Sequence, residues 1–332
     1  MHPSRRLTVR LAAFAAFACF PGAAQACTVA TTSTSLGSTS SYAAAQTVQQ
    51  GSGSAGLSCD ILLAALTTHY VGLSVDASTF ELSGPAGSSI AFEASLTPGG
   101  AALGIGNFQN LSSLSLVSLF SGTDNMVPIY FRTTPTAALR AGTYTGHLDL
   151  RWFYSVCSIG VVLCVNYSAS PGFVRPLPPL VPLNWGSGTP VRVNVELTIE
   201  NDCIIDAPAL DFGSAPLAGG FSPVTQTIQI RCSAGAAYTV GLDNGDHASG
   251  NVRRMANGGD HLAYEIYKGA SSLDRWGLLG AERRSSTAAD SNAGVYDSFT
   301  AQGFTYRAVV GPAQPTPSVG NYSDTVRIDV EF

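Results

Sequence analysis

Apolar and polar residues alternate one by one along several segments of the chain, which is the period of a β-strand with one buried face. Segment 143–154 places five large residues on one face: Tyr144, Leu148, Leu150, Trp152 and Tyr154. The same alternation occurs in 191–199, 227–232 and 325–332. The only candidate helix is the short segment 61–66. The pattern therefore predicts an all-β protein.

Turn residues such as Asp243-Asn244-Gly245 separate the predicted strands. Short strands with frequent turns are typical of antiparallel sandwiches. A weak internal repeat supports two such units, because Ala141–Gly146 opens a late strand in the first half and Val319–Asp324 opens one in the second. We expect two immunoglobulin-like antiparallel β-sandwich domains in tandem, over residues 27–199 and 200–332.

Residues 1–26 have the layout of a secretory signal peptide. Three arginines form a basic start, an apolar stretch covers Leu11–Phe20, and Ala24-Gln25-Ala26 provides a small-residue cleavage site before Cys27. The apolar stretch is too short to span a bilayer. Two other interpretations stay open: a twin-arginine signal at Arg5-Arg6, and a lipoprotein in which Cys27 carries the lipid.

Composition narrows the class of protein. Charged residues make up 12% of the chain and hydrophobic residues 45%, which excludes a disordered chain. Removal of the signal peptide with its three arginines takes the net charge from −5 to −8, and Lys268 is the only lysine. An acidic chain of this kind is not expected to bind nucleic acid.

Six cysteines remain after the predicted cleavage, an even number that suits an oxidising compartment. Spacing does not prove connectivity. Pairing of sequence neighbours is the simplest arrangement: Cys27 with Cys59, Cys157 with Cys164, and Cys203 with Cys232. No histidine lies at ligand spacing from a cysteine, so a zinc site is not expected.

No candidate motif for catalysis or ligand binding has the spacing or flanking elements that it requires. Gly51–Gly56 satisfies GxGxxG but lacks the expected strand and helix on either side, and we interpret it as a flexible turn. Asp243–Asp246 lacks the spacing of a calcium loop and is interpreted as a hairpin turn. The four histidines beyond the signal peptide are scattered. We therefore expect neither enzyme activity nor a cofactor or metal.

The second half resembles the spore coat U domain of archaic Csu-type chaperone–usher pilins. The matching residues come in order: Cys203, Leu210-Asp211-Phe212-Gly213, Ile228–Cys232, Tyr238–Leu242, Gly245, Arg254-Met255, Leu262–Tyr267, Trp276-Gly277 and Gly320–Val326. The chain departs from the family at Lys268-Gly269, where members often have an aspartate. The first half matches less well and is interpreted as a divergent copy.

The resemblance implies an assembly mechanism for the second domain. Such domains lack one strand of the sandwich; a periplasmic chaperone fills the gap first, an outer-membrane usher exports the subunit, and a strand from the adjacent pilin then replaces the chaperone. We expect the open edge at the last strand, with Val326, Ile328, Val330 and Phe332. The alternative is a complete sandwich that this strand simply closes.

The N-terminus predicts a position at the pilus tip. A stalk pilin needs a free strand before its first cysteine, whereas the predicted cleavage leaves Cys27 first. A subunit that accepts a strand without donating one would sit at the distal end of a pilus on the cell surface. Such a subunit would mediate attachment and biofilm formation.

Residues 27–199 would then carry the adhesive surface, on abiotic material or host cells. Four aliphatic residues between Cys157 and Cys164 are the first candidates, at the tip of a disulfide-stapled hairpin: Ile159, Val161, Val162 and Leu163. Ile105, Phe108 and the Pro-rich loop 173–185 are others. Alternatively, these residues are core and the disulfide braces a loop. A secreted carbohydrate- or receptor-binding β-sandwich is the second function class.

Overall fold

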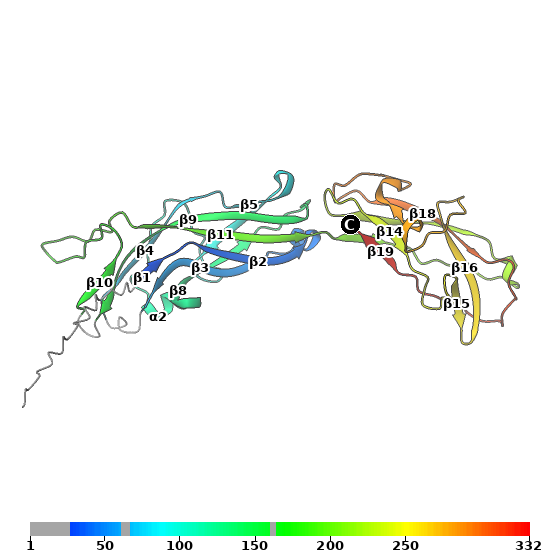
Figure 1. Ribbon diagram of the computed structural model, residues 1–332, viewed down its shortest axis with the longest axis horizontal. Helices are drawn as coiled ribbons and strands as arrows, with labels where there is room; N and C mark the ends of the chain where they lie inside the picture. The colour runs from blue at the N-terminus through cyan, green and yellow to red at the C-terminus, as the bar shows by residue number, and fades with distance from the viewer. Residues whose placement is uncertain (1–26, 61–66, 160–163) are drawn as a thin grey trace, which may run out of the picture.

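The computed structural model describes residues 27–60, 67–159 and 164–332, which form two β-rich bodies placed end to end (Figure 1). The first module contains the strands from β1 (Cys27–Val29) to β11 (Thr189–Glu200). The second module contains those from β12 (Cys203–Asp206) to β19 (Ile328–Glu331). No sheet of the described residues includes strands of both modules. The expected class, antiparallel β-sandwiches in tandem, is confirmed.

The first module is built around β9 (Gly142–Ile159), which runs its whole length and pairs antiparallel with β11. The alternation in both strands has the predicted result, since one face of each is buried. The buried side chains of β11 are Val191, Val193, Val195, Leu197 and Ile199, at 7% exposure or less. They pack with those of β9 into one apolar core.

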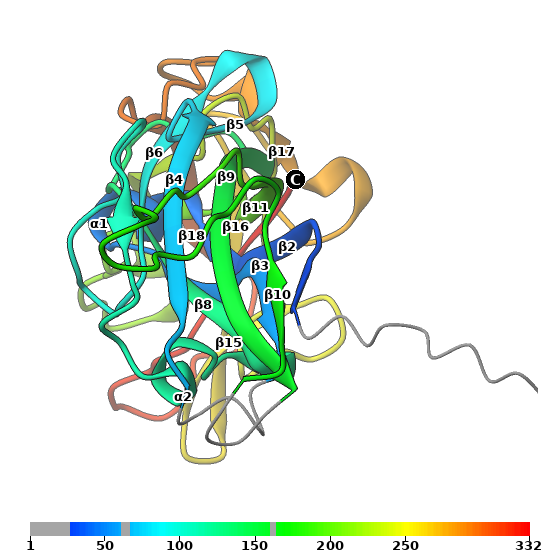
Figure 2. The ribbon, with the colours of Figure 1, turned by 90° about the vertical axis from the view of Figure 1, so that its left-hand side faces the viewer.

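The other strands of the first module are β2 (Thr32–Ser40), β3 (Gln50–Cys59), β4 (Tyr70–Ser78), β5 (Glu81–Ser83), β6 (Ser89–Ser95), β7 (Gln109–Asn110), β8 (Met126–Thr133) and β10 (Asn166–Ala169). Figure 2 views this module end-on, with β4 beside β9. β2 pairs parallel with β11, whereas the other pairs of described strands in this module are antiparallel. β11 therefore lies between β9 on one side and β2 on the other.

The GxGxxG segment Gly51–Gly56 is not the flexible turn expected from the sequence, because it lies within β3. Its glycines are needed for close packing of β2 over β3. A Cβ atom on Gly53 would lie 1.8 Å from Thr34 Oγ1, and one on Gly51 would lie 2.6 Å from the Leu36 side chain. Gly56 has a φ of +82°, which favours glycine at this irregular point of the strand.

Two short helices were not anticipated. Helix α1 (Ser41–Gln46) begins after Ser40, whose hydroxyl accepts a hydrogen bond from the Ala43 amide. Helix α2 (Leu116–Leu119) is capped by Ser115 in the same way. At six and four residues they are too short to show a helical period. The predicted helix at 61–66 lies outside the described residues.

The second module is a sandwich of two sheets. Within the described residues, one has the order β12-β13-β18-β16-β15 and the other β17-β14-β19. The new strands are β13 (Val224–Cys232), β14 (Thr239–Leu242), β15 (Arg253–Asn257), β16 (Asp260–Lys268), β17 (Arg284–Ser285) and β18 (Gln302–Val310). Trp276 and Phe304 lie fully buried between the two sheets. Turns and short 3-10 segments connect the strands.

The disulfides show that the modules are built alike. Cys27–Cys59 joins β1 to β3 and Cys203–Cys232 joins β12 to β13, each with a Cα–Cα distance of 4.0 Å. Cys157–Cys164 links the end of β9 to the segment before β10. These are the neighbour pairs expected from the sequence.

Two further details match between the modules. Tyr144 donates a hydrogen bond from its hydroxyl to the Arg140 carbonyl (2.9 Å), and Tyr322 donates one to the Ser318 carbonyl (2.8 Å). A tyrosine bonded back to the chain four residues earlier marks strand F of an immunoglobulin-type sandwich. Leu36-Gly37 and Phe212-Gly213 both begin nine residues after the first cysteine of their module. Both glycines have a positive φ, +85° and +73°.

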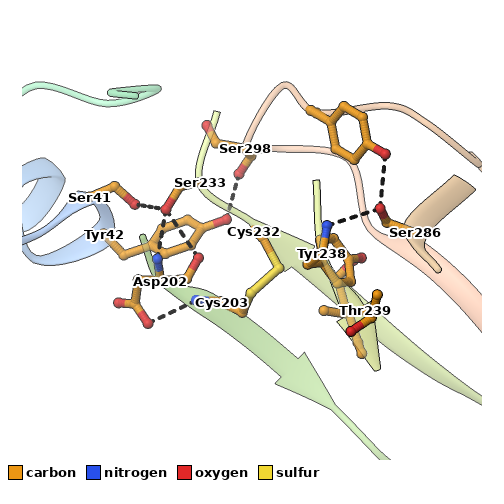
Figure 3. Close-up of a disulfide and its surroundings, with 12 residues drawn as sticks. Ser41, Tyr42, Asp202, Cys203, Cys232, Ser233, Tyr238, Thr239, Ser286 and Ser298 are labelled. Atoms are coloured by element: carbon orange, nitrogen blue, oxygen red, sulfur yellow. Dashed lines mark hydrogen bonds between the residues drawn. A yellow bond between two sulfur atoms is a disulfide. The ribbon is translucent and has the colours of Figure 1, made fainter. Parts of the chain in front are cut away.

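The modules contact one another through the start of α1 (Figure 3). Ser41 Oγ lies 2.6 Å from Ser233 Oγ, and Tyr42 donates its hydroxyl proton to the Ser298 carbonyl (3.0 Å). Ser40 donates to the Asp202 carboxylate (2.6 Å), whose other oxygen accepts from the Cys203 amide. The junction is therefore hydrogen-bonded directly beside the Cys203–Cys232 disulfide.

Candidate functional site

An open groove crosses the second module between residues 207–212 and 322–328. Its cavity volume is about 430 Å³. The side chains that line it are mainly apolar and include Leu210, Phe212, Ile228, Leu242, Met255, Ile266, Val326 and Ile328. A second cavity of about 440 Å³ continues from it and shares Leu210, Phe212, Met255 and Tyr322. Together they form one trough on the second module, mainly apolar in the first cavity and mixed polar and apolar in the second.

β19 borders this groove as an edge strand. It pairs with β14, and among the described strands it has no neighbour on its other side. Val326, Ile328 and Val330 are half-buried against the core, and Phe332 is 55% exposed. These are the residues predicted as an open edge. An unpaired edge beside an apolar trough is a template for another extended chain.

Buried polar groups fix the wall of the groove. The Asp324 carboxylate is 2% exposed and accepts hydrogen bonds from the Tyr264 hydroxyl (2.6 Å) and the His247 amide (3.2 Å). Burial and the hydrogen bond to Asp324 raise the pKa of Tyr264, so this hydroxyl stays protonated as a donor. The segment that carries Val326 is thereby held in place.

A buried arginine supports the same region from behind. Arg253 is fully buried and donates to the carbonyls of Leu242, Asp243 and Trp276, and to the Glu265 carboxylate. Its burial lowers the pKa of the guanidinium, while the Glu265 carboxylate opposes that shift. Arg253 therefore has a structural role in this module.

Exposed apolar side chains occur on three elements near the end of the first module that points away from the second. α2 and β10 lie at this end, and the loop between β10 and β11 projects from it (Figure 1). The distal apolar surface, as we call it, consists of Leu114, Val117, Val165, Leu177 and Leu180, which are 45–82% exposed. Together these exposed residues are the candidates for a contact surface at this end of the module.

The loop of residues 174–184 is a small hairpin. Val174 bonds with Asn184 through both amides, and Leu177 does the same with Val181. The turn presents Leu177 (60% exposed) and Leu180 (78%) to solvent. Backbone hydrogen bonds therefore order the hairpin before any contact, which limits the entropy lost on binding.

An aromatic cluster outside the main core holds the base of this hairpin. Trp185 packs edge-on against Phe108 (centroids 4.9 Å apart) and Phe173 (5.5 Å). The Arg175 guanidinium lies 3.8 Å from the centre of the Tyr167 ring and donates to the hydroxyl of Ser155 on β9. Arg175 thus connects the hairpin to both β9 and β10.

The sequence-predicted adhesive residues have mixed positions. Ile105 is 56% exposed and Phe108 41%, although Phe108 also packs in the aromatic cluster. Ile159 ends β9, and its side chain is outside the described part of the structure. Val161, Val162 and Leu163 lie outside the described residues. The structure therefore leaves this candidate hairpin as a prediction.

Sequence reasoning did not name Leu114, Val117 or Val165, and it named Leu177 and Leu180 only as part of a Pro-rich loop. The available signal was the run of prolines and leucines in 176–182, unusual for a buried strand. Among the described residues, no set of three or more His, Cys, Asp or Glu side chains is arranged to hold a metal. In that same part of the chain no helix has the length and apolarity to cross a membrane.

Comparison with known proteins identifies the family. Residues 189–329 match the Spore Coat Protein U domain. The whole chain is similar to a chain in the crystal structure of the CsuC–CsuE chaperone–tip adhesion subunit pre-assembly complex, from archaic chaperone–usher Csu pili of Acinetobacter baumannii. The identity is 31%, the TM-score is 0.70, and the alignment covers 92% of this chain and 100% of that one. The chain belongs to the family of tip subunits of archaic chaperone–usher pili.

Other comparisons add little to this family assignment. The CupB6 tip adhesin of Pseudomonas aeruginosa is 13% identical with a TM-score of 0.27, over 85% of this chain and 84% of that one. At that TM-score it carries no weight. No curated protein sequence matches. As a family member, the chain is a pilus adhesin with a spore coat U domain.

Proposed function

We propose that this protein is the tip adhesin of an archaic chaperone–usher pilus and attaches the cell to surfaces, with no catalytic step. The observation that carries the proposal is the separation of two apolar features on one rod. The open groove lies on the second module, and the distal apolar surface lies at the far end of the first. The groove is suited to binding a neighbouring subunit during pilus assembly, and the distal apolar surface is suited to contact with an external surface.

The groove would accept an extended strand. A periplasmic chaperone would cover it first, since an exposed edge and trough promote aggregation. After export through an outer-membrane usher, the strand of the adjacent pilin would replace the chaperone. Main-chain hydrogen bonds to β19 and apolar side chains entering the groove would supply the binding energy.

The distal apolar surface would make the adhesive contact and support biofilm growth. Burial of each exposed aliphatic side chain against an apolar material gains about 1–2 kcal/mol. The chain is weakly charged, at 12% charged residues, so little charge must be desolvated around the contact. Ile159, Val161, Val162 and Leu163, which the sequence predicts to be adhesive, would add to this contact.

Inhibition of adhesion separates this proposal from a carbohydrate-binding adhesin. Piliated cells are allowed to attach to polystyrene and to glycan-coated wells, with a non-ionic detergent or a panel of monosaccharides. We expect detergent to abolish attachment to polystyrene and sugars to leave it unchanged. Attachment that resists detergent and is lost with one sugar would overturn the proposal in favour of a carbohydrate-binding protein.

A further inference from the structure

We propose that a cavity on the side of the first module is a binding site for a neutral saccharide. The cavity lies over β3, β8 and β6, has a volume of about 270 Å³, and takes a further wall from Pro98 and Gly99 in the loop after β6. None of its described lining residues belongs to the distal apolar surface or to the groove of the second module. The inference therefore goes beyond the proposed function and stands on this chain alone.

The first observation is an aromatic ring without a partner. Ile129 and Phe131 of β8 are buried in the core, and the half-buried Tyr130 between them projects from the outer face of the sheet. Its neighbours across the sheet are two serines, Ser52 on β3 and Ser95 on β6, which are too short to cover a phenol ring. Among the described residues, the Tyr130 hydroxyl has no hydrogen bond and the ring contacts no other aromatic ring. Part of the ring is therefore free to contact a ligand.

The second observation is an ion pair with unused hydrogen-bonding capacity. On the same face of the sheet, Arg132 lies between Glu93 on β6 and Gln50 on β3. Nε (2.7 Å) and Nη2 (2.5 Å) of Arg132 both contact Oε2 of Glu93, and the two side chains are 46% and 50% exposed. Glu93 Oε1, Arg132 Nη1 and the Gln50 side-chain amide have no partner within the described ranges. One hydroxyl that donates and one that accepts can therefore bind here side by side.

These groups match the two kinds of surface on a sugar ring. A hexopyranose has C–H groups on its faces, which pack on an aromatic ring such as that of Tyr130, and hydroxyl groups around its edge. Of two adjacent hydroxyls, one would donate to Glu93 and the other would accept from Arg132. Sites for small ligands combine an apolar surface with a few polar groups of this kind. The ligand is neutral, because Glu93 already compensates the charge of Arg132 and would repel an anion.

A second cavity on the same module shows what the ring adds. It lies over β2, β9 and β11, has a volume of about 440 Å³, and is lined by hydroxyl, amide, imidazole and carboxylate side chains, including His147, Asn194 and Glu196. Its described lining contains no Phe, Tyr or Trp. Hydrogen bonds to such groups replace equally good bonds to water, so by themselves they contribute little net affinity. We therefore assign the saccharide to the smaller cavity and use the larger one as the control.

Saturation-transfer NMR on the purified full chain tests the site. The probes are methyl α-mannoside, methyl β-galactoside and methyl β-glucoside, each at about 20 mM, which is enough to occupy a site of millimolar affinity. We expect transfer to the ring C–H protons of at least one of them. Tyr130→Ala should weaken that binding about tenfold and Glu93→Gln about fivefold, whereas Tyr130→Phe, which keeps the ring, should retain it. Asn194→Ala in the larger cavity should leave the binding unchanged.

The urea midpoint of each variant separates loss of binding from loss of folding, and Glu93→Gln, at an exposed residue, keeps the test decisive if Tyr130→Ala is unstable. Transfer to none of the three sugars, or equal binding by the wild type, Tyr130→Ala and Glu93→Gln, would overturn the proposal. Loss of binding with Asn194→Ala alone would place the sugar in the larger cavity and would also overturn it. The result does not depend on adhesion, since attachment to polystyrene can be sensitive to detergent whether or not a sugar binds to the side of the module.

Discussion

The Ser41 and Ser233 hydroxyls lie 2.6 Å apart in a buried contact that joins the two modules. Ser233, which directly follows Cys232, also accepts a hydrogen bond from the Asp202 amide (2.7 Å) (Figure 3). Its side chain therefore links the second module to α1 and to the connecting segment. The two modules are thus joined by side-chain hydrogen bonds as well as by the two-residue connection.

Replacement of Ser233 by alanine should weaken the junction. The half-buried Asp202 amide and the buried Ser41 hydroxyl would lose their partner, at a cost of about 1–3 kcal/mol. Urea unfolding monitored by tryptophan fluorescence, with small-angle scattering for the distribution of shapes, measures the change. Ser52→Ala, at an exposed residue of β3, is the control, and equal stability of the two variants would contradict a role for the contact.

Arg253→Met tests the support behind the groove. Removal of the fully buried guanidinium takes the Arg253 hydrogen bonds from the carbonyls of Leu242, Asp243 and Trp276, whereas Glu265 keeps its ion pair with Arg275. We expect a loss of about 3–5 kcal/mol in the free energy of unfolding of the second module. Arg192→Met, which removes an exposed ion pair with Asp149, should cost at most about 1 kcal/mol. Similar costs for the two variants would refute the structural role of Arg253.

Arg175→Lys should loosen the hairpin without altering the apolar residues that it presents. Lysine keeps the charge but loses the planar stack on Tyr167 and the fork of hydrogen bonds to Ser155 and Thr68. We expect normal piliation and static binding but earlier detachment of cells from polystyrene under flow. Arg151→Lys on β9 is the control. Detachment at the wild-type shear would show that Arg175 does not position the hairpin.

Ile328→Arg should prevent assembly. The side chain is half-buried at the edge of the groove, where a charge would face Leu242 and the incoming apolar residues. Co-purification of the protein with its periplasmic chaperone should be lost, whereas Leu273→Arg, at a residue 78% exposed, should leave it intact. Recovery of an equimolar complex with Ile328→Arg would contradict the assignment of the groove.

Strand alternation and the ordered spore coat U residues predicted most of the fold. In β9 and β11 the period of two reflects which side faces the core, so the pattern in the sequence and the burial agree. The prediction of a flexible turn at Gly51–Gly56 was wrong. The glycines there allow β2 to pack closely over β3. Short helices α1 and α2 depend on serine caps and on tertiary contacts that carry no period.

The adhesive surface was harder to predict for a physical reason. Exposed apolar residues in loops resemble core residues in composition, and Leu177 and Leu180 become recognisable only when the hairpin is seen to project. Likewise Val191–Ile199 has the pattern of an ordinary strand. The module that it completes is defined by pairing between distant segments, which alternation alone does not encode.

Adhesion of cells carrying Leu177→Ser and Leu180→Ser tests the central claim most directly. The matched control is Leu273→Ser with Leu279→Ser, which removes two equally exposed leucines (78% and 76%) from the second module. With piliation equal in both strains, we predict attachment to polystyrene at least tenfold lower for the first variant and unchanged for the second. Wild-type attachment of the Leu177→Ser, Leu180→Ser strain would contradict adhesion through the distal apolar surface.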